Sequence, residues 1–442
     1  MSSAAYITPN SSSDRAGDLL YRKIAWRIMP ILVIGYIIAY IDRVNVSFAK
    51  LQMLGDLKFS ESVYGIGAGI FFLGYFAFEI PSNIILHKVG ARFWICRVMV
   101  TWGIVSALTA LVRTPMQFYT ARMLLGVAEA GFFPGMILYL TYWFPAHRRA
   151  AMVALLMAGN PVSGIIGGPL SGFVMQHFAG IKGMAGWQWL FVVEAIPAIL
   201  LGVVIYFFLD NRVVEAKWLS ERERAVVSSE IREETVTKTH VSIRSVFTSP
   251  RVWLFGAIFF GMEIGSYAIG FWQPTIIRET GVKDAFHIGM LTTLPYTCAL
   301  ICMIFVGRHS DRIRERRWHV IVPNTVAAFG FILCTQASST PIAMFGLVLA
   351  VAGVITGLAM FWALPTSFLG GNAAAAGIAL INCTGNLGGF FSPTIIGFLK
   401  TYTGRLNSGL FLVAACMIAS SVLILTLTPA KLPTAQPTGA QI

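Results

Sequence analysis

Charged residues are scarce in this sequence, and their scarcity excludes an ordinary soluble protein. Asp, Glu, Lys and Arg make up 12% of the 442 residues, whereas a soluble domain carries roughly 25%. Hydrophobic residues make up 56%, and the mean hydropathy is +0.71. The composition therefore predicts a polytopic membrane protein, with room for about a dozen spans of roughly 20 residues.

The sequence also lacks the local patterns on which enzymes depend. We find no cofactor fingerprint, no nucleophile elbow, and no His or Cys cluster with metal-ligand spacing. The seven histidines are scattered, and the six cysteines fall in or beside apolar runs, where they serve as small apolar side chains. We therefore expect neither an enzyme nor a bound cofactor or metal.

The net charge of +13 would suggest a nucleic-acid partner in a soluble protein, but membrane topology accounts for it here. Twelve apolar runs lie near 26–48, 62–86, 93–112, 117–144, 150–178, 188–209, 252–277, 287–306, 319–338, 341–368, 374–399 and 408–429. With the N-terminus inside, 23 Lys and Arg residues fall in inner segments and 8 in outer loops. Because basic residues concentrate on the cytoplasmic side, we expect both termini in the cytoplasm and no nucleic-acid partner.

The two halves of the chain repeat each other. The pattern G-x-A-E-x-x-x-x-P at 126–134 returns as G-x-A-M-x-x-x-x-P at 357–365, and a Gly-Asn pair occurs at 159–160 and at 385–386. These repeated patterns fall at corresponding positions in the first six and the last six apolar runs. They therefore indicate a parallel duplication of six spans. The predicted fold class is an all-α membrane protein with twelve transmembrane helices in two six-helix bundles.

The apolar runs and the repeat together divide the chain into five parts. We expect a disordered cytoplasmic N-terminus (1–23), an N-terminal six-helix bundle (24–209), a cytoplasmic linker (210–251), a C-terminal six-helix bundle (252–430) and a cytoplasmic tail (431–442). Within the linker, the nearly charge-balanced stretch 216–234 predicts an amphipathic helix on the membrane face, with Trp218, Leu219, Val226 and Val227 on one side.

Four charged residues lie within apolar runs and need an explanation. Arg122 and Glu129 are seven residues apart, so in a helix they project from one face roughly 10 Å apart. Asp42 and Arg43 lie near the end of the first run. Each charge at mid-bilayer costs on the order of 2.5–3.5 kcal/mol. We therefore expect these four residues to form the working centre of the protein.

The same four residues could instead have purely structural roles. Arg122 and Glu129 could form a static ion pair, although buried pairs stabilise poorly compared with apolar packing. Asp42 and Arg43 could extend their charges toward the membrane surface. Three more acids lie in apolar runs: Glu79 and Glu194 are interpreted as structural, and the sequence assigns no role to Glu263 in the seventh run.

Several motifs resemble the major facilitator superfamily, and more closely its anion:cation symporter family of bacterial organic-acid permeases. The loop after the eighth run, GRHSDRIRER, fits the superfamily, with the motif G-x-x-x-D-R at 307–312. The finer resemblance rests on YIDRVNVSFA (40–49), GYFAFEIPSNIILHKVGARFWI (74–95), RMLLGVAEAGFFPG (122–135), WQWLFVVEAIPA (187–198) and AKWLSERE (216–223). Members of that family carry tartrate, galactonate, glucarate, phthalate, hydroxyphenylacetate and hydroxynicotinate.

The resemblance implies roles for individual residues. Asp42 and Glu129 would carry protons, while Arg122 and Arg43 would hold the carboxylate of the substrate. The residues expected to complete the pocket are Tyr40, Tyr75, Asn160, Gln273 and Asn386. The two asparagines could instead join helices by hydrogen bonds, and the two tyrosines could be packing aromatics. We interpret Asp311 and Arg312 as a cytoplasmic gate whose charges pair across the halves in one state.

The resulting expectation is a proton symporter that imports an organic acid by alternating access across the bacterial inner membrane. Its expected partners are a small carboxylate, protons and the lipid bilayer, and we expect a monomer. A substrate carboxylate that takes over an arginine would leave the acids without a partner, and they would then bind protons. The alternative function is a proton-coupled antiporter that exports a small metabolite or drug. Hydroxydicarboxylates such as tartrate and aromatic carboxylates both suit an arginine flanked by Tyr and Trp272.

Overall fold

The computed structural model of the chain describes residues 12–236, 247–368 and 371–427, and every regular element in those residues is a helix. The helices of the N-terminal half are α1 (Ser12–Val44), α2 (Val46–Leu57), α3 (Glu61–Val89), α4 (Ala91–Leu108), α5 (Pro115–Glu129), α6 (Phe132–Thr141), α7 (Ala146–Met157), α8 (Gly159–His177) and α9 (Gly186–Phe208). After α10 (Glu221–Val236), the C-terminal half holds α12 (Pro250–Glu279), α13 (Ala285–Ile313), α14 (Trp318–Thr335), α15 (Thr340–Phe361), α16 (Ala363–Phe368), α17 (Gly371–Thr403) and α18 (Asn407–Leu427). The expected tail, 431–442, and the first part of the expected N-terminal segment, 1–11, lie outside the described residues.

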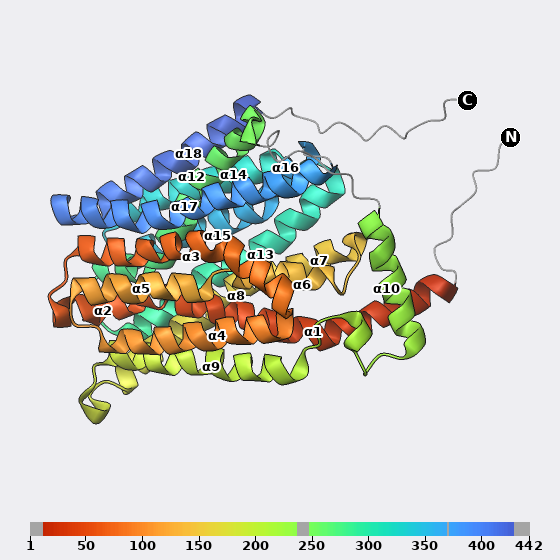
Figure 1. Ribbon diagram of the computed structural model, residues 1–442. Coiled ribbons are helices and arrows are strands. Elements are labelled where there is room, and N and C mark those ends of the chain that lie inside the picture. Colours follow the sequence, from red (N-terminus) through yellow and green to blue (C-terminus); the bar gives the residue numbers. More distant parts are fainter. Residues whose placement is uncertain (1–11, 237–246, 369–370, 428–442) are drawn as a thin grey trace.

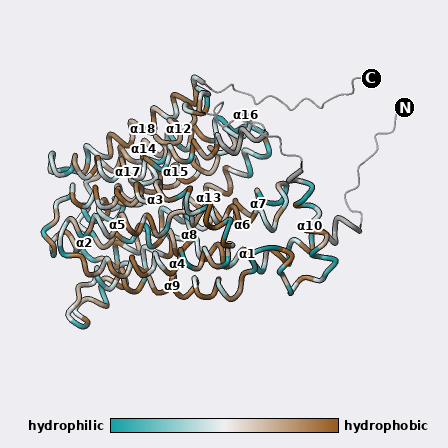
Figure 2. The backbone as a smooth tube through the Cα atoms, in the orientation of Figure 1, coloured by the Kyte–Doolittle hydropathy of each residue, from teal (hydrophilic) through white to brown (hydrophobic). Residues whose placement is uncertain are grey.

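These helices form twelve spans, six in each half. Eleven segments among the described residues are long and apolar enough to cross a membrane, and α17, with 33 residues, is the remaining span. The two halves lie one above the other in Figure 1, and Figure 2 shows hydrophobic residues along both. The predicted all-α fold of two six-helix bundles is confirmed.

The fourth span is two helices rather than one, and the sequence explains the break. Gly131 adopts φ +81°, in the left-handed region, between α5 and α6. Pro134 lies in the first turn of α6 and has no N–H to donate to the carbonyl of Ala130, four residues earlier. The helix therefore ends at Glu129, and that acid lies at the discontinuity.

The halves approach each other most closely through glycines. A Cβ on Gly289 of α13 would lie 2.2 Å from the carbonyl oxygen of Gly168 on α8. A Cβ on Gly65 of α3 would lie 2.4 Å from the carbonyl oxygen of Pro393 on α17. Only residues without a side chain allow such contact, so α8 packs against α13 and α3 against α17, as Figure 1 shows for the second pair.

The start of α1 and the linker helix α10 lie together at one end of the bundle (Figure 1). The Tyr21 hydroxyl donates to Glu230 at 2.9 Å, and Lys23 pairs with Glu223 at 3.0 Å. Hydrogen bonds from the Ser220 backbone and the Lys23 ammonium hold the pKa of Glu223 below its usual value. Asp18 also pairs with Arg148 at 2.7 Å. Residues 12–23 form the start of α1 rather than part of the expected disordered segment, and these contacts hold Asp18, Tyr21 and Lys23 in place.

The linker helix forms as predicted, but over a shorter range. Trp218 and Leu219 precede α10, and the Trp218 ring stacks on Trp143 with centroids 5.8 Å apart. Val227 is buried, whereas Val226 is exposed and does not share its face. Two of the four expected residues thus anchor the linker from the turn before the helix.

Candidate functional site

The four charged residues predicted to form the centre come together from two helices of the N-terminal half. Asp42 and Arg43 lie in the last turn of α1, directly before Asn45, the residue between α1 and α2. Arg122 and Glu129 lie on α5. The Arg122 guanidinium donates to the carbonyl oxygen of Arg43 at 3.4 Å, which joins the two helices directly.

Arg43 and Glu129 form an ion pair between α1 and α5. The Glu129 side chain is fully buried, whereas that of Arg43 is 11% exposed. Three rings surround the Arg43 guanidinium, with centroids 5.1 Å away for Tyr40 and 5.4 Å for Phe71 and Tyr75. Cation–π contact of this kind stabilises a desolvated cation by about 2 kcal/mol or more. Tyr40 and Tyr75 therefore contact Arg43 at the centre, and their place in a substrate pocket stays a prediction.

Neutral donors, rather than an arginine, hold the Asp42 carboxylate. The Trp102 indole N–H donates to Oδ2 at 2.8 Å, and the Ser106 hydroxyl donates to Oδ1 at 3.3 Å, both from α4. The Asn45 amide lies at 3.5 Å. Among the described residues no arginine forms an ion pair with Asp42, so the expected neutralisation of this acid by Arg43 or Arg122 does not occur in this state.

Arg122 is fully buried and has no carboxylate partner among the residues that the structure describes. Its Nε donates to the carbonyl oxygen of Gly67 at 3.4 Å, while Nη1 has no hydrogen-bond partner. The static Arg122–Glu129 ion pair is therefore absent from this state. A buried guanidinium with a spare donor is costly, and a bidentate anion is the ligand that would satisfy it.

The remaining predicted pocket residues lie on three other helices, α17, α8 and α12. Asn386 on α17 accepts a long hydrogen bond, 3.5 Å, from Tyr267 of α12, whose ring packs against Phe72 of the other half at 4.5 Å. Asn160 is half-buried near the start of α8. Gln273 is buried beside Ile41 and Val44, in a small cavity between α1, α2, α8, α12 and α13, and its amide nitrogen has no partner in the described residues.

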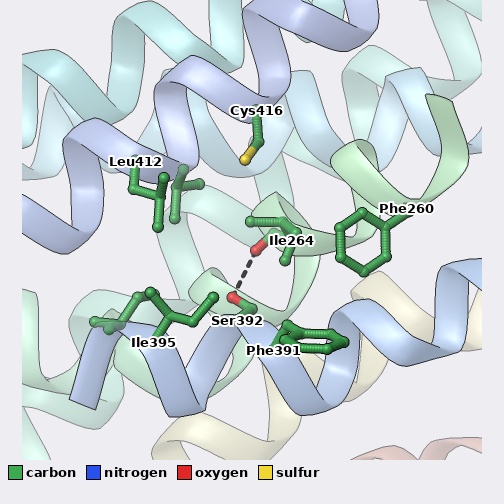
Figure 3. Close-up of a pocket in the computed structure, with 9 residues that line it drawn as sticks. Phe260, Ile264, Phe391, Ser392, Ile395, Leu412 and Cys416 are labelled. Atoms are coloured by element: carbon green, nitrogen blue, oxygen red, sulfur yellow. Dashed lines mark hydrogen bonds between the residues drawn. The ribbon is translucent and has the colours of Figure 1, made fainter. Parts of the chain in front are cut away.

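A larger cavity, about 150 Å³, does not belong to this centre. It lies between α12, α17 and α18, and Figure 3 shows its apolar lining. Its one hydroxyl, on Ser392, already donates to the carbonyl oxygen of Ile264 at 2.8 Å. The cavity offers no group that would recognise an anion.

Asp311 does not pair across the halves in this structure. It pairs with Arg316 of the following turn at 2.5 Å, within the C-terminal half. Arg312 is exposed and forms no ion pair in the part of the chain that the structure describes. The predicted gate charges thus remain on one side of the interface in this state.

A charge cluster that the sequence did not predict joins the halves at the opposite end from α10. This far-end cluster consists of Lys50 (α2), Glu61 (α3), Glu279 (α12) and Lys400 (α17). Lys400 lies 2.8 Å from Glu61 and 2.7 Å from Glu279, and Lys50 lies 2.8 Å from Glu61. Lys50 also donates to Thr275 of the other half at 3.0 Å.

The far-end cluster is buried around Lys50 and exposed at Glu279. Lys50 is only 3% exposed, and its ammonium lies 3.7 Å from the centroid of the Trp272 ring. Next to the cluster, the Ser62 and Thr401 hydroxyls are 2.7 Å apart across the interface. Lys50 and Lys400 were expected in loops, but both belong to helices that extend past the apolar runs. The far end is therefore closed.

Known proteins resemble this chain along nearly its whole length. A family model described as the Major Facilitator Superfamily matches residues 32–393. The chain is 46% identical over 428 residues to "Putative metabolite transport protein NicT" of Pseudomonas putida, covering 96% of this chain and 98% of that protein. It is 48% identical over 409 residues to "Putative tartrate transporter" of Agrobacterium vitis, covering 92% of this chain and 90% of that protein.

A more distant relative carries a different name, and the solved structures agree on the fold. The chain is 37% identical over 405 residues to "Quinolone resistance transporter" of Acinetobacter baumannii, covering 91% of this chain and 93% of that protein. The inward open conformation of the xylose transporter XylE from E. coli superposes with a TM-score of 0.74 at 14% identity, covering 91% of this chain and 96% of that structure's chain.

Proposed function

The chain belongs to the major facilitator superfamily and is a transporter rather than an enzyme, and from that premise we propose that it imports an organic acid anion by proton symport. The relative named as a tartrate transporter supports an organic acid as the cargo, and the relative named as a metabolite transport protein is consistent with a small metabolite. The observation that carries the proposal is the fully buried Arg122 guanidinium with an unpartnered Nη1, next to the Arg43–Glu129 ion pair.

The proposed mechanism is an exchange of partners at Glu129. A substrate carboxylate binds Arg122, whose planar guanidinium can hold it with two hydrogen bonds, and competes with Glu129 for Arg43. Glu129 then faces an anion without its own cation, and proton binding relieves the repulsion. By linkage, the proton must tighten substrate binding by the same factor. Asp42 provides a second carboxyl beside the first.

Alternating access would proceed from the closed far end. With the termini and α10 in the cytoplasm, as the distribution of Lys and Arg predicts, the far-end cluster closes the protein toward the outside. Import requires the contacts of Lys400 with Glu61 and of Ser62 with Thr401 to break, so that the anion can enter between α3 and α17. The fourth span is broken at Gly131, beside Glu129, which is typical of transporter binding sites.

The test is Glu129→Gln in proteoliposomes loaded at pH 8 and diluted into pH 6 medium with labelled tartrate or hydroxynicotinate. Gln keeps the shape of the side chain but cannot carry the proton. We expect uphill accumulation to be lost, while exchange of labelled for unlabelled acid at equal pH continues. Glu221→Gln, on the exposed start of α10, serves as the matched control and should accumulate normally. Full accumulation by Glu129→Gln would refute the assigned role.

The antiporter alternative has support from the relative named as a quinolone resistance transporter. The same proteoliposomes distinguish the two functions by direction. Acid outside drives uptake by a symporter, whereas it drives export of preloaded substrate by an antiporter. Two guanidinium groups at the centre favour an anion over a cationic drug, and we therefore place symport first.

A further inference from the structure

Glu263 is the only Asp, Glu, Lys or Arg in the apolar runs of the C-terminal half. It lies 13 residues into α12, about 20 Å along the helix. An acid at such a depth is costly and is retained for function more often than for packing. The proposed steps of anion and proton binding use only residues of the N-terminal half, so Glu263 needs a role of its own.

Glu263 lies on the face of α12 that meets the other half. Glu263, Tyr267 and Gly270 are spaced i, i+4 and i+7 and so share one stripe. The Tyr267 ring packs against Phe72 of α3, and a Cβ on Gly270 would lie 3.4 Å from Val44 of α1. The stripe therefore faces α1 and α3 beside the charged centre.

The surroundings of Glu263 leave its carboxylate available to a ligand. Its side chain is half-buried, and the Ser266 hydroxyl on the same helix is its neighbouring donor. No basic residue forms an ion pair with it in the described parts of the chain, and the positive charge that reaches it is that of Arg43, across the interface. Gly388 of α17 lies against its Cβ, and Asn386 of the same helix supplies a polar group nearby.

The two sides of the interface thus carry opposite charges near the centre. The N-terminal half presents guanidinium groups, and the C-terminal half presents one carboxylate. On the basis of the proposed function, we propose that Glu263 selects organic acids whose end opposite the bound carboxylate carries a hydroxyl or N–H donor. Such a donor can hydrogen-bond to Glu263, whereas a second carboxylate at that end meets a like charge and an acid without a donor leaves an acceptor oxygen unpaired.

The test compares acids of one skeleton that differ only at the far end. The aromatic series is 4-hydroxybenzoate, terephthalate and 4-methylbenzoate, and the aliphatic series is 4-hydroxybutyrate, succinate and butyrate. Binding to the purified full-length protein is measured as ligand-dependent thermal stabilisation, which rises with ligand concentration relative to Kd. In the series that binds, we expect the wild type to prefer the hydroxy acid over the dicarboxylate at least tenfold.

Glu263→Gln should reduce that preference at least tenfold, mainly by improved binding of the dicarboxylate, because Gln is uncharged and can donate to it. Glu263→Asp keeps the charge and should keep the preference. Glu221→Gln, on the exposed start of α10 and outside both the centre and the far-end cluster, is the matched control and should leave the ratio unchanged. An unchanged ratio in Glu263→Gln overturns the assignment of Glu263 alone. Failure of the wild type to bind any acid of either series overturns this inference. The proposed function is overturned only if the proteoliposomes also show no uptake of tartrate or hydroxynicotinate driven by the pH gradient.

Discussion

Lys400 provides the sharpest test of how the far end is held closed. Its ammonium contacts Glu279 in its own half and Glu61 in the other half. Opening the far end separates only the second pair, because Lys400 and Glu279 move together. We therefore predict that Lys400→Met, which retains much of the apolar stem, shifts the conformational equilibrium toward the state with the far end open.

The structure sets the size of this shift. The side chains of Lys400 and Glu61 are 13% and 24% exposed, so solvent screens the pair in part. Exposed pairs are worth about 0.2–1 kcal/mol, and this pair belongs at the upper end of that range because it is part of a network. A loss of about 1 kcal/mol changes the ratio of open to closed molecules about fivefold. At about 1 M salt the difference between variant and wild type should shrink.

The assay uses Thr394→Cys as a reporter of opening. Thr394 is buried at the interface, where its hydroxyl donates to the carbonyl oxygen of Gly65 at 3.3 Å. A thiol there reacts with a maleimide only when α3 and α17 separate. We expect Lys400→Met to raise the labelling rate of Cys at 394 about fivefold, measured on the isolated peptide by mass spectrometry, so that the native cysteines do not interfere.

Lys283→Met is the matched control, since it removes the same charge near the same end. Lys283 is exposed and forms no ion pair within the described residues, so the labelling rate should stay at that of the parent. Equal labelling rates for Lys400→Met and its parent would refute the reasoning. So would an equal increase in the control, which would assign the effect to net charge rather than to the Lys400–Glu61 contact.

Two further predictions concern the centre. Arg122→Lys should weaken carboxylate binding at least tenfold in the thermal-stabilisation assay, because an ammonium cannot hold a carboxylate bidentately; unchanged affinity would remove Arg122 from the site. Trp102→Phe should lower stability by about 1.5–3 kcal/mol more than Trp143→Phe, since both lose indole volume but only Trp102 donates to a buried carboxylate. Equal losses in thermal unfolding would contradict the assigned hydrogen bond.

The sequence predicts the helices and the burial of the four charges well, because both follow from long apolar runs. Long apolar runs must form helices in a membrane, where no water can satisfy the backbone. The seven-residue spacing correctly places Arg122 and Glu129 on one helix, α5. Gly131 and Pro134 are a local signal for the helix break after Glu129. The same residues belong to the repeated pattern at 126–134, and from the sequence we interpret them only as part of that repeat.

The partners of the charges could not be predicted, because they depend on how the helices are rotated against one another. Asp42 and Arg43 are neighbours in sequence, yet one turns toward α4 and the other toward α5. The far-end cluster joins Glu61 to Lys400, which are more than 300 residues apart in the chain. Lysines at the ends of apolar runs are typical of loops, and only the packed bundle shows that these two are helical and paired.

The unequal environments of the two acids suggest how a single site can separate substrate sensing from proton storage. Glu129 has an exchangeable partner, since Arg43 is partly exposed and a substrate carboxylate can compete for it. Asp42 has fixed partners, because Trp102 and Ser106 belong to α4, within the same half, and cannot be displaced by an anion that binds the guanidinium groups. On the proposed mechanism the substrate therefore acts on Glu129 first. A proton on Asp42 can respond only through the charge of its neighbours, so loss of Glu129 should uncouple transport more completely than loss of the donors to Asp42.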